Sequence, residues 1–212
     1  MWALSTSKIK SKASPYHHGD LRNTLLTSGA QLLAEEGIQA LSLRSLAKRA
    51  GVSHNAPYQH FADKETFLAA LAEQGFHLLG AAMDAGLQAV GEADTLACLI
   101  AIGQAYVQFA LDYPSHLHIM FSSFPHERYP TLKQTSLEVL AKLIAVLEAG
   151  QAQQRLVPDD VYQQALLVWT MLHGLSTLSA AQKLPDPLIS AQSPVALAEE
   201  AMKRLYQGIA KS

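Results

Sequence analysis

Residues 41–67, LSLRSLAKRAGVSHNAPYQHFADKETF, decide how this chain folds. They predict two short helices around a tight turn, followed by the start of a third helix. Gly51 stands where the first helix must end, because glycine tolerates the left-handed backbone of a helix C-terminus. Four apolar residues recur at helical spacing and give that first helix one buried face: Leu43, Leu46, Ala47 and Ala50.

The second helix of this stretch is expected over about His54–Phe61. Ser53 is placed to cap it, since a serine hydroxyl can accept a hydrogen bond from a free backbone N–H. Pro57 lacks a backbone N–H and is expected to tighten the helix start. The helix carries hydrogen-bonding side chains rather than a run of charges, a layout typical of a recognition helix in a helix-turn-helix.

The rest of the chain is helical in pattern, and no segment has the alternation of a strand. We expect three parts, which are a flexible arm over residues 1–18, a helix-turn-helix domain over 19–66 and a helical domain over 67–212. Helices are expected at about 20–37, 42–50, 54–61, 64–90, 95–113, 115–122, 131–153, 158–183 and from 194 onward.

Charge is distributed unevenly along the chain. Residues 1–60 carry seven basic and three acidic residues, a balance of +4, whereas residues 61–212 carry nine basic and fifteen acidic ones, a balance of −6. A basic end beside an acidic body indicates that only the N-terminal part faces a polyanion. A solvated surface would give the same count, so that alternative stays open.

The composition excludes several classes of protein. A chain with 49% hydrophobic and 16% charged residues is globular, and no apolar run approaches the roughly 20 residues that span a bilayer. The N-terminal lysines precede no apolar core of a secretory signal. We therefore expect a cytoplasmic protein without a membrane partner.

Chemistry-bearing motifs are also missing from the sequence. Cys98 is the single cysteine, which excludes an internal disulfide and a multi-cysteine metal site. No two of the nine histidines lie at helical i, i+4 spacing, so no metal and no cofactor are expected. The chain has no phosphate-binding glycine loop, no G-x-S-x-G and no convincing pair of carboxylates, and we do not expect an enzyme.

The stretch from Gly19 to Phe76 resembles the DNA-binding domain of the TetR family of bacterial transcriptional regulators. The matching residues are LSLR at 41–44, LA at 46–47, AGVS at 50–53, Tyr58, HF at 60–61 and DK at 63–64. A second, independent resemblance lies in the C-terminal half, where W-x-x-x-H-G at 169–174 is similar to the signature of a TetR C-terminal class called WHG.

The resemblance implies an all-α homodimer of about nine helices per chain. Three N-terminal helices would bind DNA, the middle helices would enclose an inducer pocket, and the last two would form a four-helix dimer interface. The sequence departs from the family pattern at Pro57, where a bulky aliphatic residue is usual, and at Gln59, where a basic residue is frequent. Gln59 offers a neutral amide that can pair with an adenine edge.

The predicted DNA contacts fall into two groups. Base edges are expected to meet the exposed side of the recognition helix, at His54, Asn55, Ala56 and Gln59. Phosphates are expected to meet the surrounding polar groups, although packing or plain solvation remains an alternative for several of them. The full set is Ser42, Arg44, Ser53, His54, Asn55, Ala56, Tyr58, Gln59, His60 and Lys64.

The C-terminal domain carries two further predicted sites, each with ordinary core packing as its alternative. A ligand pocket is expected where aromatic and sulfur-containing residues mix with a few polar groups: Phe76, Met83, Gln104, Tyr106, Phe109, His116, Met120, Phe121, Phe124, Trp169 and His173. A dimer interface is expected along two apolar seams: Leu166, Trp169, Leu172, Ala198, Met202, Leu205 and Ile209.

Together these patterns predict a DNA-binding regulator. A ligand-responsive repressor would bind an inverted-repeat operator as a homodimer and would be released by a small, largely apolar effector. An activator, or a regulator controlled by a partner protein, would carry the same DNA motif and remains the alternative.

Overall fold

The computed structural model describes residues 18–91, 94–125, 127–185 and 192–211. Within these ranges the chain forms eight α-helices and one short 3-10 helix, and the described residues contain no strand, only an isolated bridge between Leu156 and Ala210. The predicted all-α class is confirmed. Most of the arm predicted over residues 1–18 lies outside the described residues.

The N-terminal part is a small unit of α1 (His18–Glu36), α2 (Leu43–Arg49), the 3-10 helix η1 (Ala56–Gln59) and the first turns of α3 (Lys64–Val90). Phe61 and Phe67 form its centre, with ring centroids 5.1 Å apart in an edge-to-face arrangement. α1 supplies Leu25 and α2 supplies Leu46, both fully buried against this pair. These few side chains hold the helix-turn-helix together.

Local signals set most of the helix ends in this unit. Gly37 and Gly51 follow α1 and α2 with φ angles of 77° and 68°, the left-handed backbone expected after a helix. The first helix was expected from about residue 20, and α1 begins two residues earlier, at His18.

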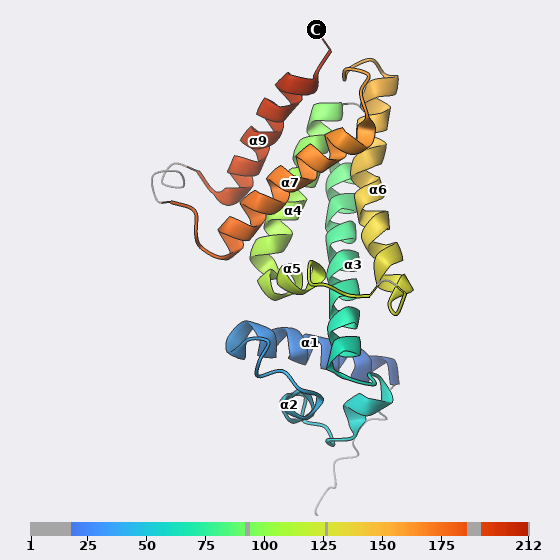
Figure 1. Ribbon diagram of the computed structural model, residues 1–212. Coiled ribbons are helices and arrows are strands. Elements are labelled where there is room, and N and C mark those ends of the chain that lie inside the picture. The colour runs from blue at the N-terminus through green and yellow to red at the C-terminus, as the bar shows by residue number, and fades with distance from the viewer. Residues whose placement is uncertain (1–17, 92–93, 126, 186–191, 212) are drawn as a thin grey trace, which may run out of the picture.

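The body of the molecule consists of α3, α4 (Thr95–Asp112), α5 (Pro114–Met120), α6 (Pro130–Ala152), α7 (Val161–Ala180) and α9 (Pro194–Ile209). α3 is one continuous helix that leaves the N-terminal unit and runs up through the body beside α6 (Figure 1). It therefore crosses the predicted domain boundary after residue 66. Residues 53–61, the reading segment, carry most of the predicted DNA contacts and end three residues before α3 begins.

α4 is the central helix of the body and contacts α3, α6, α7 and α9. Gly103 allows a close approach, since a Cβ there would lie 3.0 Å from Met202 Cγ of α9 and 3.2 Å from Leu172 Cδ2 of α7. α4 is also long and apolar enough to cross a membrane by length and composition, with a mean hydropathy of 1.3. Half of it is buried in the bundle, and its packing accounts for that apolar character.

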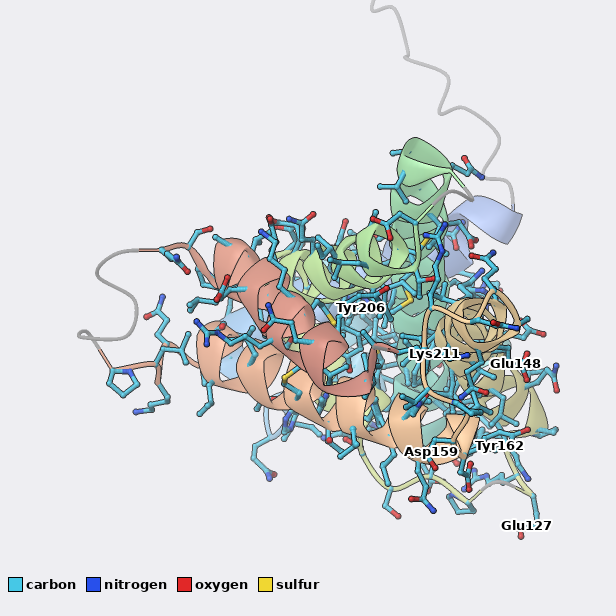
Figure 2. All side chains as sticks on the ribbon, turned by 90° about the horizontal axis from the view of Figure 1, so that it is seen from above. Glu127, Glu148, Asp159, Tyr162, Tyr206 and Lys211 are labelled. Atoms are coloured by element: carbon cyan, nitrogen blue, oxygen red, sulfur yellow. The ribbon has the colours of Figure 1, made fainter. Side chains whose placement is uncertain are left out.

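α7 and α9 lie side by side on one side of the body (Figures 1 and 2). Asp160 caps α7 by accepting from the backbone N–H groups of Tyr162 and Gln163, at 2.9 Å and 3.4 Å. Ser193 caps α9, and Pro194 occupies its first turn as expected. The outer surfaces of these two helices are not covered by any other described element.

Candidate nucleic-acid interface and internal cavity

The predicted recognition helix is wrong in its type. Within residues 54–61 the helical part is a single 3-10 turn, η1 (Ala56–Gln59), rather than an α-helix. The backbone N–H groups of Ala56, Tyr58 and His60 donate to carbonyls three residues back, at 2.9–3.2 Å. Pro57 is the physical reason, because it cannot donate the bond that an α-helix would need at this point, and its ring is buried. Pro57 was expected to tighten only the start of the helix, but the tighter 3-10 geometry extends over all of η1.

Ser53 does not cap this segment with its hydroxyl. Its backbone carbonyl accepts from Ala56 at 2.9 Å, and Asn55 stands at the N-cap without a side-chain bond. The side chains expected to face DNA nevertheless lie at the surface. Ser53, His54, Asn55, Tyr58 and Gln59 are all exposed, and half of the Tyr58 surface is accessible. Ala56 packs against the core and presents little surface to a base.

The preceding helix contributes a second polar surface. Ser42 is the N-cap of α2 and accepts from the backbone of Ser45 at 3.0 Å, while the Ser45 hydroxyl accepts from Ser42 N–H at 2.8 Å. This capping box sets the start of α2. Arg44, in the first turn of α2, is exposed, and no ion pair is found for it within the described ranges. A free guanidinium at this edge suits a phosphate.

Two predicted phosphate contacts are engaged inside the protein. Lys64 Nζ donates to the carbonyl of Ile38 at 2.6 Å, which ties the start of α3 to the loop after α1. His60 is half-buried, and its Nε2 is enclosed without a hydrogen-bond partner in the described part of the chain. The packing alternative therefore describes His60 better, and Lys64 has a structural role in addition to any contact with DNA.

Ion pairs join the first turn of α3 to the body of the molecule. Asp63 is the N-cap of α3 and accepts from the backbone and hydroxyl of Thr66, at 2.7 Å and 2.8 Å. Arg128, in the segment between α5 and α6, lies 2.5 Å from Asp63 Oδ2 and 3.2 Å from Glu65 Oε1. The backbone of Thr66, its hydroxyl and the Arg128 guanidinium lower the pKa of Asp63 to about 2.

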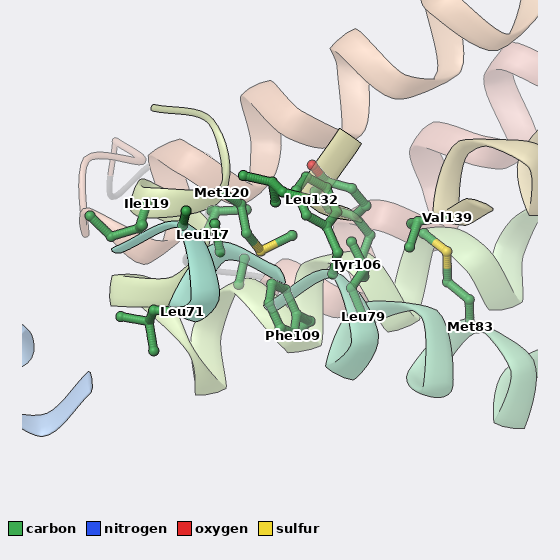
Figure 3. Close-up of a cluster of buried hydrophobic side chains, with 14 of the residues drawn as sticks. Leu71, Leu79, Met83, Tyr106, Phe109, Leu117, Ile119, Met120, Leu132 and Val139 are labelled. Carbon is green, nitrogen blue, oxygen red and sulfur yellow. The ribbon is translucent and has the colours of Figure 1, made fainter. Parts of the chain in front are cut away.

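An internal cavity of about 400 Å³ lies in the body, between α3, α4, α5, α6 and α7. This volume is within the roughly 300–1,000 Å³ of small-molecule sites. Figure 3 shows Leu79, Met83, Tyr106, Met120, Leu132 and Val139, which come from four helices and form much of its wall. Seven of the predicted pocket residues line it: Phe76, Met83, Tyr106, Met120, Phe121, Phe124 and Trp169.

Four predicted pocket residues do not line this cavity. Gln104 donates to Glu199 of α9 at 3.1 Å, and Phe109 stacks near Tyr113 at 5.5 Å between ring centroids. His116 is buried beside α3, with Nε2 3.2 Å from Gln74 Oε1, and burial lowers its pKa. His173 does not line the cavity and packs behind residues that do. Helical periodicity predicts that these residues face the interior of the protein. It does not predict which neighbouring helices they contact.

His173 supports the cavity wall through its neighbours. Its Nδ1 lies 3.0 Å from the hydroxyl of Tyr106, and its ring centroid lies 4.3 Å from that of Phe121. Burial lowers the pKa of His173 and raises the pKa of Tyr106. The ring is therefore neutral near pH 7, and its Nδ1 shares a hydrogen bond with the Tyr106 hydroxyl.

The predicted pocket contains no residue of α6, although that helix lines one side of the cavity. Leu137 and Leu140 belong to the helical spacing expected over residues 131–153, and that spacing is the available signal. The full set of lining residues absent from the predicted pocket is Leu79, Ile102, Ser122, Pro125, Tyr129, Leu132, Lys133, Ser136, Leu137, Val139, Leu140, Leu143 and Leu172.

The predicted dimer seam requires a correction. Leu172, Ala198 and Met202 are fully buried inside the subunit, because they pack against Gly103 and its neighbours on α4. Trp169 is half-buried in the cavity wall, and Leu205 and Ile209 are half-buried. Only Leu166 of the predicted set is exposed. The exposed apolar surface of α7 instead comprises Tyr162, Leu166, Leu167 and Leu178.

Two segments of the chain match known sequence families. Residues 25–71 match the family described as bacterial regulatory proteins, tetR family. Residues 99–205 match the family described as Tetracyclin repressor-like, C-terminal domain. The first match contains the reading segment, and the second contains most of the cavity.

Individual proteins resemble the chain over different lengths. A solved structure of a protein with unknown function from Rhodococcus sp. RHA1 is 31% identical, has a TM-score of 0.81, and the alignment covers 94% of this chain and 100% of that chain. The TetR family regulator PfmR from Thermus thermophilus is 22% identical, with a TM-score of 0.69 and coverage of 86% and 97%. The class A tetracycline repressor of transposon 1721 from Escherichia coli is 45% identical over 51 residues, which are 24% of each chain.

Proposed function

Since the chain belongs to the TetR family of bacterial transcriptional regulators, we propose that it is a ligand-responsive repressor. In this proposal a homodimer binds an inverted-repeat operator in the cytoplasm, and a small, largely apolar effector releases it. Its role is regulation of transcription rather than catalysis. Its similarity to a protein named as a repressor supports the repressing role.

The observation that carries the proposal is that one helix, α3, lines the cavity and begins directly after the reading segment. Phe76, Leu79 and Met83 of α3 line the cavity, and the same helix begins three residues after Phe61, which closes the reading segment. A ligand that favours one position of α3 would shift the population of reading-segment positions. Effector binding and DNA binding would then be coupled in both directions.

The exposed face of α7 supports a dimer. Leu166 and Leu167 are 53% and 59% exposed on a helix whose other side is core, and Gly174 on the same helix has no neighbour within 4 Å of a Cβ position. An apolar strip with an open glycine allows a second helix to approach closely. A two-fold pair of subunits would present two reading segments to half-sites about one helical turn or more apart.

Base reading would rest on neutral side chains. Asn55 and Gln59 can each form two hydrogen bonds with an adenine edge, and both are exposed, Asn55 at the N-cap of η1 and Gln59 at its last residue. Arg44 would contribute a phosphate contact and part of the salt dependence of binding. Because Lys64 also holds Ile38, Arg44 is the cleaner residue with which to test phosphate binding.

The proposal is tested first by footprinting on the DNA upstream of the gene and of its neighbours. We expect a protected inverted repeat, and protection without two-fold symmetry would contradict the proposed dimer. A reporter in a deletion strain separates the two signs of regulation. Higher expression of the target on deletion indicates a repressor, and lower expression indicates an activator.

Variants then test the reading segment by fluorescence anisotropy on the operator and on a scrambled duplex. Asn55→Ala and Gln59→Ala should each lose about 1–3 kcal/mol of discrimination between the two duplexes. Arg44→Ala should weaken binding to both duplexes alike. Equal losses on both duplexes for Asn55→Ala would remove Asn55 from base reading.

A further inference from the structure

The polar groups that line the cavity differ in how much hydrogen-bonding capacity they have left for a ligand. Most of the wall is apolar, and its hydroxyl and ammonium groups belong to Tyr106, Ser122, Tyr129, Ser136 and Lys133. A ligand that enters must match whichever of these has unused hydrogen-bonding capacity, since a buried polar group left unpaired weakens binding.

The hydroxyl hydrogens of the two serines are already committed, whereas the buried Tyr129 hydroxyl has no hydrogen-bond partner among the described residues. Ser122 Oγ donates to the carbonyl of His118 at 3.2 Å, and Ser136 Oγ donates to the carbonyl of Lys133 at 2.7 Å. The Tyr106 hydroxyl is hydrogen-bonded to His173 Nδ1 at 3.0 Å. The serines can accept a bond from a ligand but offer it no donor, and Tyr129 offers a single neutral one.

Lys133 differs in its ion pairing from the other lysine of its helix, Lys142. It lies on the first turns of α6 at the wall of the cavity and is exposed. Nine residues later, Lys142 is paired with Asp84 at 2.5 Å, whereas Lys133 has no ion pair among the described residues. Its ammonium group carries three donors and a full charge.

No aspartate or glutamate is found among the described residues that line the cavity. The acidic side chains nearest along α3 are engaged elsewhere, since Glu73 accepts from Thr131 at 3.3 Å and Asp84 holds Lys142. The cavity therefore combines an apolar wall with one uncompensated positive charge at its edge.

We propose that the effector is an apolar molecule with one carboxylate, whose head group binds Lys133 while its hydrocarbon body packs against Phe76, Met120 and Trp169. This inference rests on the proposed function and narrows its effector to a chemical class. The body of the ligand supplies hydrophobic binding, and the carboxylate supplies a charge-assisted hydrogen bond and selects against neutral analogues.

The test is isothermal titration of the full-length protein with decanoate and with decanol, which share a ten-carbon chain and differ in the charge of the head group. Decanoate is expected to bind about tenfold more tightly, the lower end of what a hydrogen bond to a charged group contributes. In Lys133→Met the two ligands should bind equally. Lys133→Arg should restore the preference for decanoate.

Lys142→Met is the matched control, because it removes a lysine from the same helix outside the cavity wall, and it should keep the preference for decanoate. Equal affinity of both ligands for the unaltered protein, or a preference that survives in Lys133→Met, would overturn the carboxylate assignment and leave an apolar effector site. Binding of neither ligand would also overturn the assignment. Operator binding is measured separately, so failure of the DNA-binding proposal is distinguishable from each of these results.

Discussion

Arg128 and Asp63 join the cavity wall to the DNA-binding unit, with Nη2 and Oδ2 2.5 Å apart. Asp63 caps α3 two residues after Phe61, while Tyr129, the neighbour of Arg128, lines the cavity. The same guanidinium lies 3.2 Å from Glu65. A displacement of the segment between α5 and α6 would therefore pull directly on the start of α3.

Arg128→Met is expected to lower operator affinity while having only a small effect on the free energy of unfolding. The pair is half-exposed, so its loss should cost at most about 1 kcal/mol of stability. Operator affinity should fall by about two- to thirtyfold, the range of a coupling of 0.5–2 kcal/mol. Amide hydrogen exchange should become faster over residues 54–66.

The control for this variant is Arg155→Met. Arg155 has a similar exposure and lies 3.5 Å from Asp94, away from the DNA-binding unit. It should leave operator affinity and the exchange of residues 54–66 unchanged. If both variants behave alike, the pair of Arg128 and Asp63 has no special part in linking the two regions.

Gly29→Ala should disrupt the helix-turn-helix. A Cβ at Gly29 would lie 2.1 Å from Cζ of the fully buried Phe67 ring, and that ring is held edge-to-face against Phe61. Overpacking of this kind typically costs about 1–3 kcal/mol. Thermal unfolding should occur at a lower temperature, and operator binding should be weakened with it.

Gly86→Ala provides the comparison, because its Cβ would lie 3.4 Å from Ala101, an ordinary contact distance. Alanine is favoured over glycine in a helix by about 1 kcal/mol, so this variant should be as stable as the unaltered protein or more stable. A Gly29→Ala protein with an unchanged melting temperature would mean that the Phe67 ring moves aside at little cost.

His116 should make stability fall in mild acid. Burial lowers its pKa in the folded protein, while the unfolded chain titrates near about 6.5. Below that pH the unfolded state binds more protons than the folded state, so the free energy of unfolding decreases as the pH falls from about 7 towards 5. His173, whose pKa is also lowered, contributes in the same direction.

Denaturant unfolding at several pH values measures this effect. His116→Gln should make the free energy of unfolding less dependent on pH between about 7 and 5, because one of the buried titrating groups is gone. His118→Gln, at an exposed position of the same helix, should keep the full dependence. The assignment would be wrong if both variants retained the same slope.

Leu167→Glu should convert a dimer into a monomer. Leu167 is 59% exposed on the apolar face of α7, so the charge can be accommodated in a single subunit but would be buried without a partner in a dimer interface. Sedimentation velocity gives the mass directly. Gln88→Glu adds the same charge at an exposed position of α3 and should remain dimeric, and a Leu167→Glu dimer would exclude this face as the interface.

The helix-turn-helix could be predicted from the sequence because its signals are local. Gly51 ends α2 with the expected left-handed backbone, and Phe61 is buried as expected. Pro57 departs visibly from the family pattern, but its effect on the helix type is larger than the sequence alone indicates. A missing N–H in so short a segment leaves too few α-helical bonds to hold the wider turn.

The cavity and the dimer interface in the C-terminal domain were less predictable, because they depend on which helix faces pack against one another. The seam that contains Leu172 and Met202 is apolar, as a core or a subunit interface would be. Gly103 on α4 decides between the two, since it lets both side chains pack inside one subunit. Likewise, the apolar periodicity of α6 is visible in the sequence, but that half of the cavity follows from the tertiary contact between α6 and α3.

The position of Trp169 gives this protein an optical reporter of its own. The chain has two tryptophans, and the other, Trp2, lies at the far N-terminus, whereas Trp169 lines the cavity and packs beside Phe121 and His173. Replacing Trp2 with Phe would leave one indole, in contact with whatever enters. Its emission would then follow cavity occupancy in real time, without a label and in the presence of DNA.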